Sequence, residues 1–218
     1  MTAGNLSVID TTLAGLGWLD ELGMLESPTA EKAIHFLCVR QKPDGGWDED
    51  AALEPGKNAL PPWIKPGEMA TRMYLTANTA YWLAVSGGTN RPHFHRALGF
   101  ITGQQGNDEE GFGYLHTAWI AASVFLLAGR RNMDAARKAT QFFVDQPLAG
   151  WECSQIAWAL NNLSVAGLPD SNPFVVRALG ELVQRQSIDG CWVSEDGSTH
   201  TADATIQVLK ALGYYDLL

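Results

Sequence analysis

The sequence has few cysteines, few charged residues and no long apolar run. Its three cysteines lie far apart among 218 residues, which does not fit a disulfide framework and indicates a reducing compartment, so we expect a cytoplasmic protein. No segment reaches the roughly 20 uncharged apolar residues of a membrane span, and the first ten residues lack the pattern of a secretory signal. The longest apolar run, about 118–129, predicts a buried helix.

Basic residues are also scarce. There are 15 lysines and arginines against 24 acidic residues, which gives a formal net charge of -9, and no basic run occurs. Such a surface repels polyanions over most of its area. We therefore expect neither a nucleic acid nor an anionic membrane as partner.

What the sequence does contain is a turn that recurs four times. Its versions are Gln41–Trp47, Gln105–Phe112, Gln146–Trp151 and Gln186–Trp192, each between two helix-like stretches. Similarity that returns along the chain is typical of a repeat architecture. Glycine allows a tight reversal, the tryptophan ring packs between hairpins, and the glutamine can bond backbone groups of its neighbour, so we interpret these turns as structural.

Two kinds of helix alternate between the turns. Segments with one charged and one apolar face predict outer helices near 30–41, 92–105, 132–146 and 173–187. Segments that are apolar on nearly every side predict buried inner helices near 69–86, 115–128, 153–166 and 200–212, and a further helix is expected near 7–22. Left-handed glycines are expected to end the inner helices, at Gly87, Gly129, Gly167 and Gly213. The sequence thus predicts one all-α domain, 1–218, of about nine helices in hairpins.

The turns resemble the QW motifs of the squalene and oxidosqualene cyclases and of related prenyltransferase repeats. The match is full at Gln41-Lys-Pro-Asp44-Gly45-Gly46-Trp47, while Cys191 replaces one glycine in 186–192 and the other two turns are degenerate. The resemblance covers about 28–214 and implies an α/α toroid with its chemistry in an apolar central cavity. Complete rings of the family have more hairpins, so the resemblance implies an incomplete or tighter ring, a homodimer or a partner subunit.

The resemblance also points to an acid at the start of the last inner helix. In class II terpene cyclases the motif Asp-x-Asp-Asp-Thr heads such a helix, and its middle aspartate protonates the substrate. Here Thr201-Ala-Asp203-Ala-Thr205 places Asp203 on that aspartate, although both flanking acids are lost. Burial would raise the pKa of Asp203, and His200 on the same helical face would orient its proton. Alternatively, the helix macrodipole alone favours an acid there and His200 caps the helix.

Aromatic residues are candidates for the walls of the substrate cavity. Ring faces stabilise cations, as a carbocation cascade requires, although large aromatic side chains also simply fill helical cores. The candidates are Tyr74, Tyr81, Trp82, Trp119, Trp158 and Trp63. Trp63 lies in the connection 48–67, where we interpret Asp48-Glu49-Asp50 as a solvated loop and expect Pro61-Pro62-Trp63-Ile64 to lay a ring over the cavity.

A metal site is the competing chemistry. Protein prenyltransferases share the repeat and bind zinc through Asp-x-Cys and His-Thr, and His116, Cys153 and His200 offer soft ligands at inner-helix starts. Trp151 stands where that family has its carboxylate ligand.

The resemblance therefore predicts a proton-initiated terpene cyclase, of isomerase or lyase type. It would act without a cofactor on an isoprenoid or prenyl-substituted substrate. Two alternatives stay open: a non-catalytic helical module that binds an isoprenoid or a protein, and a zinc-dependent prenyltransferase-like enzyme.

Overall fold

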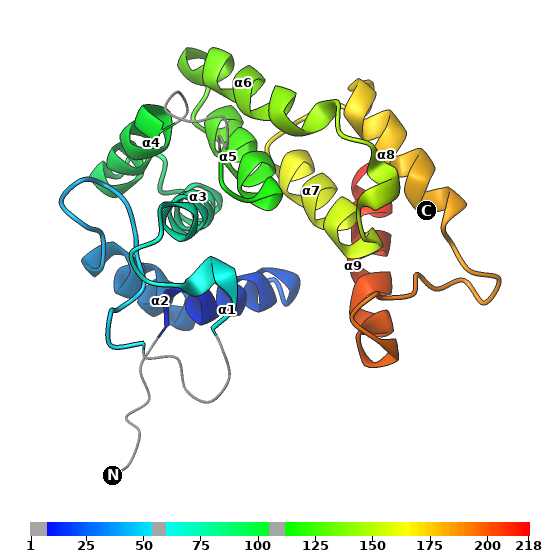
Figure 1. Cartoon of the computed structure of the whole chain (residues 1–218), viewed down its shortest axis with the longest axis horizontal. Helices are drawn as coiled ribbons and strands as arrows, with labels where there is room; N and C mark the ends of the chain where they lie inside the picture. The colour runs from blue at the N-terminus through cyan, green and yellow to red at the C-terminus, as the bar shows by residue number, and fades with distance from the viewer. Residues whose placement is uncertain (1–7, 54–59, 105–111) are drawn as a thin grey trace, which may run out of the picture. The chain divides into compact units, whose positions relative to one another are not determined.

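The computed structural model describes residues 8–53, 60–104 and 112–218, and over these residues the chain is helical with no strand. The described part of the chain contains nine α-helices, which are labelled in Figure 1. Their bounds are α1 Ile9–Glu21, α2 Pro28–Val39, α3 Met69–Val85, α4 Pro92–Gln104, α5 Leu115–Leu127, α6 Met133–Val144, α7 Cys153–Val165, α8 Pro173–Gln184 and α9 Thr201–Tyr214. Four short 3-10 helices join them, η1 Pro62–Ile64, η2 Arg130–Asn132, η3 Leu148–Gly150 and η4 Ser198–His200.

These bounds confirm the helices expected from the sequence, because the start and stop signals are local. Outer helices α2, α4 and α8 each begin at a proline, whose missing N–H costs nothing in a first turn. Ahead of α2, the Ser27 side chain accepts a hydrogen bond from the Ala30 N–H at 3.3 Å.

Three of the four glycines expected to end inner helices do so. Gly87, Gly129 and Gly167 have φ of 74°, 86° and 78°, which is the left-handed region that glycine adopts at no steric cost. The expectation was wrong at Gly213, because α9 continues through it to Tyr214 and the left-handed residue is Asp216.

The chain divides into two compact units, Met1–Thr117 and Ala118–Leu218. In the first unit α3 packs against α1, α2 and α4, and Figure 1 shows α3 between α4 and the α1–α2 pair. Twelve residues of α3 are buried, as expected of an inner helix. In the second unit α7 packs against α8 and, most extensively, against α9.

The last inner helix was expected to be buried on all sides, but part of its surface is exposed. Ile206 and Leu209 of α9 are exposed, whereas Val208 and Leu212 are buried. Within its unit α9 packs mainly against α7, which leaves Ile206 and Leu209 outside that contact. The prediction of a fully buried helix at 200–212 was therefore wrong.

The first and last tryptophan turns fasten an outer helix to the inner helix that follows it. Trp47 and Trp192 are almost fully buried, and their indole N–H groups donate to the carbonyls of Leu37 at 2.7 Å and Leu182 at 2.6 Å. Their backbone N–H groups donate to threonine hydroxyls, Thr76 in α3 at 2.9 Å and Thr205 in α9 at 3.1 Å. Both turns thus have the structural role expected of them, while most of the turn 105–112 lies outside the described residues.

No helix of the described chain is long and apolar enough to cross a membrane.

Candidate functional site

The predicted acid and its partner lie at the surface of the second unit. Asp203 is exposed in the first turn of α9, and the exposed His200 is the N-cap residue of that helix. The exposed carboxyl of Asp203 lacks the apolar surroundings expected of a proton donor for an alkene, and among the described residues no hydrogen bond joins the two side chains. The catalytic role of this pair therefore stays a prediction that the surroundings of Asp203 do not favour.

The predicted aromatic residues fall into separate clusters. In the second unit Trp119 is 1% exposed, and its ring centroid lies 5.5 Å from that of Trp158 in an edge-to-face arrangement. In the first unit the rings of Tyr81 and Trp82 make a similar pair at 5.3 Å. These are contacts of core packing, so a role of these four residues in stabilising cations also stays a prediction.

The zinc alternative gains no support. Within the described ranges no three histidine, cysteine, aspartate or glutamate residues come together in a way that could hold a metal ion. His116 lies against the rings of Tyr74 and Tyr114, and burial lowers its pKa to about 4. Cys153 is buried near Arg185, and burial raises the pKa of its thiol.

The first unit contains a pair of acids that the sequence interpretation missed. Glu49 is only 3% exposed. Its Oε2 accepts from the Ile9 N–H at 3.0 Å and its Oε1 from the Asp10 N–H at 2.9 Å, so this carboxylate satisfies the free amides that begin α1. The solvated-loop interpretation of 48–50 was therefore wrong at Glu49, because the buried Trp47 draws the following residues against α1.

Asp10 is the second acid of this pair. Its Oδ1 accepts a hydrogen bond of 3.0 Å from the Tyr74 hydroxyl, and that hydroxyl accepts one of 3.3 Å from Asn78 Nδ2. Trp63, in the short helix η1, is close enough for its side chain to affect the Asp10 carboxyl. Tyr74 and Trp63 were both expected near a substrate, and the structure brings both to Asp10.

The surroundings favour the protonated forms of both acids. Burial raises the pKa of Asp10 above its ordinary value, although hydrogen bonds from Tyr74 and Trp63 oppose the shift. Burial also raises the pKa of Glu49 against the opposing hydrogen bonds from the Asp10 and Ile9 N–H groups, and repulsion from Asp10 and Asp48 adds to the shift. Tyr74 has a raised pKa for the same reasons, so its phenol stays a hydrogen-bond donor at neutral pH.

Aromatic rings border this acid pair. The Tyr74 ring meets His116 edge-on with centroids 4.9 Å apart, and Tyr114 stacks on His116 at 5.2 Å. With a pKa near 4, His116 is neutral at pH 7. Glu49 is buried and Asp10 only partly, so Asp10 is the more exposed acid of the pair.

One sequence signal could have pointed to Asp10. Asp10 and Thr12 have the same spacing as Asp203 and Thr205, and both aspartates lie in the first turn of an α-helix. What separates the two acids is burial, which for Asp10 comes from partners 39 and 64 positions away along the chain.

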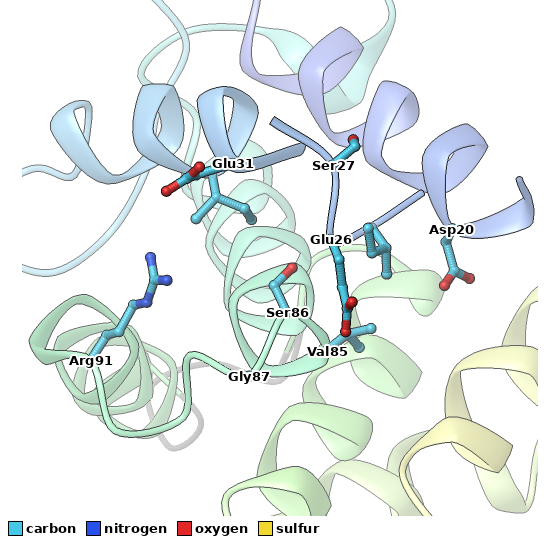
Figure 2. Close-up of a pocket in the computed structure, with 10 residues that line it drawn as sticks. Asp20, Glu26, Ser27, Glu31, Val85, Ser86, Gly87 and Arg91 are labelled. Atoms are coloured by element: carbon cyan, nitrogen blue, oxygen red, sulfur yellow. The ribbon is translucent and has the colours of Figure 1, made fainter. Parts of the chain in front are cut away.

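A polar cleft lies at the opposite ends of α1 and α3 from Asp10. Its volume is about 690 Å³ and its walls include Asp20, Glu26, Glu31, Ser86 and Arg91. Figure 2 shows Glu31 and Arg91 on one side of this cleft and Asp20 on the other. Walls of such charge do not fit an apolar isoprenoid chain, so this cleft is not the apolar cavity expected from the sequence.

No protein-family model matches the chain, and no curated protein matches it. The resemblance to the QW repeats thus rests on the motif residues themselves, and a function has to be argued from the chemistry of the site.

Proposed function

We propose that this protein binds an isoprenoid-type chain and starts its cyclisation by protonation, with Asp10 as the proton donor. The observation that carries the proposal is the environment of the Asp10 carboxyl, which is partly buried, has a raised pKa and interacts with the Tyr74 hydroxyl and with Trp63. A perturbed acid among aromatic side chains suits the first step of such a reaction.

The reaction balances without a cofactor. The carboxyl O–H bond of Asp10 breaks as a C–H bond forms at one alkene carbon, which leaves a carbocation and the Asp10 carboxylate. The electrons of a second double bond then close the ring. Loss of a proton from the final carbocation to the carboxylate restores the acid. The Tyr74 phenol stabilises the carboxylate between these two proton transfers.

The toroid arrangement belongs to the same proposal. It is supported by the common construction of the first and last turns, in which the indole of Trp47 or Trp192 holds the preceding outer helix. Small-angle X-ray scattering on the purified chain tests it, because an open arc of hairpins has a larger radius of gyration than a closed ring of the same mass.

A pair of matched variants tests the acid. Asp10→Asn keeps an oxygen that accepts from Tyr74 but removes the transferable proton, and Asp203→Asn makes the same change at the exposed acid. The purified proteins are incubated in D₂O with linear prenyl chains and prenylated aromatic compounds, and products are analysed by mass spectrometry. We expect deuterated cyclic products from the wild type and from Asp203→Asn, and a loss of about 100-fold or more in Asp10→Asn.

Each other outcome has a clear meaning. If Asp203→Asn loses turnover and Asp10→Asn keeps it, the acid is Asp203 and the assignment to Asp10 is wrong. If the wild type gives no cyclic product but binds the chains saturably, the protein is a non-catalytic isoprenoid-binding module. Thermal unfolding of both variants confirms that they are folded.

A further inference from the structure

We propose that the polar cleft at the ends of α1 and α3 binds a basic α-amino acid such as L-lysine. The proposal is independent of the proposed cyclisation, because Asp10 lies in the first turn of α1 and the cleft lies at the other end of that helix. All the residues that line the cleft belong to the first unit. Its volume of about 690 Å³ lies within the range of pockets that hold small molecules.

One side of the cleft has two opposite charges that form no ion pair. Figure 2 shows Glu31, from the first turn of α2, and Arg91, directly before α4, on the same side. Among the described residues neither of them forms an ion pair with another side chain. A ligand with an ammonium and a carboxylate group on one carbon can bind both, the ammonium at Glu31 and the carboxylate at Arg91. These two groups are the head of an α-amino acid.

Arg91 is held in place to bind a carboxylate. Its stem packs closely on Gly88, where an added Cβ would lie 3.1 Å from Arg91 Cδ. The guanidinium interacts with the Cys38 thiol, which uses only part of its five N–H donors. The remaining donors suit a carboxylate, which an arginine binds by two parallel hydrogen bonds.

The other side of the cleft is acidic. Figure 2 shows Glu26 and Asp20 on the side away from Arg91, and Glu26 forms no ion pair with any described side chain. The carboxyl-terminal ends of α1 and α3 also lie at the cleft, and neither last turn contains a basic residue. Since the macrodipole makes such helix ends negative, this side favours a second cationic group on the ligand.

Apolar side chains complete the lining. Leu25, Ile34 and Val85 line the cleft, and Leu25 and Val85 are partly exposed. Methylene groups of a ligand bury apolar area against such side chains. A basic α-amino acid has the required order of groups, which is a zwitterionic head, an aliphatic stem and a terminal cation.

A hydroxyl without a partner lies between the two sides. Ser86 is the C-cap residue of α3, and its Oγ is buried and forms no hydrogen bond to any described atom. An unpaired buried hydroxyl costs free energy. Because the residue as a whole is only partly buried, rotation about its Cα–Cβ bond turns the hydroxyl toward a ligand, where it can donate to the carboxylate.

The charges of the lining separate this ligand from simpler ones. The lining has three acids, Asp20, Glu26 and Glu31, and one base, Arg91. A diamine would leave Arg91 without an anion, and an amino acid with an apolar side chain would leave Glu26 without a cation. Lysine has two cationic groups and one anionic group and provides for both.

A titration of the isotope-labelled full chain with L-lysine at low ionic strength tests the site. NMR follows the backbone amides of Ser27 and Gly87, which both line the cleft. We expect saturable shifts with a Kd of about 1 mM, because each ion pair at a partly exposed site contributes little.

Three analogues, each without one group of lysine, assign the contacts. Cadaverine lacks the carboxylate, 6-aminohexanoate lacks the α-ammonium and norleucine lacks the side-chain ammonium. We expect each to bind about fivefold more weakly than lysine.

Matched variants pair each analogue with one residue. Arg91→Gln should weaken lysine binding about fivefold and leave cadaverine binding unchanged. In the same way Glu31→Gln should leave 6-aminohexanoate binding unchanged, and Glu26→Gln should leave norleucine binding unchanged. Glu68→Gln changes an exposed acid at the N-cap of α3 and is the control that should alter none of these affinities. Thermal unfolding verifies that the variants are folded.

The proposal is overturned if lysine gives no saturable shift up to about 50 mM, or if the shifts map away from the cleft. Cadaverine binding as tightly as lysine would overturn the amino-acid assignment and leave a site for simple organic cations. Equal losses in Glu68→Gln and Glu31→Gln would overturn it as well, because the overall charge alone would then account for binding.

Discussion

The Tyr74 hydroxyl donates a hydrogen bond of 3.0 Å to Asp10 Oδ1, which joins the first turn of α1 to the first half of α3. In Tyr74→Phe this bond is lost, and since it lowers the pKa of Asp10, that pKa should rise further. Carboxyl carbon chemical shifts measured by NMR over a pH series would show the change. We also expect a loss of about 1 kcal/mol in the free energy of unfolding, because Asn78 loses its acceptor. Tyr215→Phe, in the second unit, should leave the Asp10 titration unchanged.

Stability should depend on pH through Asp10. The pKa of Asp10 is raised in the folded state above the value of 3.8 that it has in an unfolded chain. As pH rises above about 3.8, the unfolded chain releases this proton first, so the wild type loses stability until the pH passes the folded-state pKa. Asp10→Asn does not titrate. The free energy of unfolding is measured in urea for both proteins. The difference, Asp10→Asn minus wild type, should therefore increase over this pH window and be constant above it. A difference that does not vary with pH would contradict the raised pKa.

Gly45→Ala should be more damaging than Gly190→Ala. Both glycines have positive φ, so both substitutions incur a backbone strain of about 1–2 kcal/mol. Only at Gly45 would the new methyl group lie 2.5 Å from a carbonyl oxygen, that of Arg96. We expect a further loss of about 2 kcal/mol for Gly45→Ala from this overpacking, measured by urea unfolding. Equal losses would mean that α4 yields easily at this contact.

Removing either buried indole should weaken the unit that contains it. Trp47→Phe and Trp192→Phe each lose the N–H bond to a helix-end carbonyl and leave a void in the core. We expect each to cost about 2–4 kcal/mol. Amide hydrogen exchange with mass spectrometry should show faster exchange mainly in residues 8–117 for the first variant and in 118–218 for the second. Trp18→Phe provides the control, because Trp18 is 70% exposed and its replacement should change little.

Much of the fold could be predicted from the sequence because its signals are local. Three outer helices start at prolines, the helices follow a helical apolar period, and two buried indoles bind the helix directly before them, Trp47 at Leu37 and Trp192 at Leu182. The burial of the last inner helix was harder to predict. Whether α9 is buried depends on which helices cover it, and its apolar sequence does not contain that information.

The sequence by itself thus determined the helices, their alternation and the tryptophan turns. Only the tertiary structure decided that Asp10 is partly buried and has a raised pKa. Asp10 and Asp203 stand in similar local sequences, but Asp10 is covered by Glu49 and Tyr74, which are 39 and 64 residues away, while Asp203 is exposed. The physical reason is that desolvation, which favours the protonated carboxyl, depends on the groups that surround it in space and not on its neighbours along the chain.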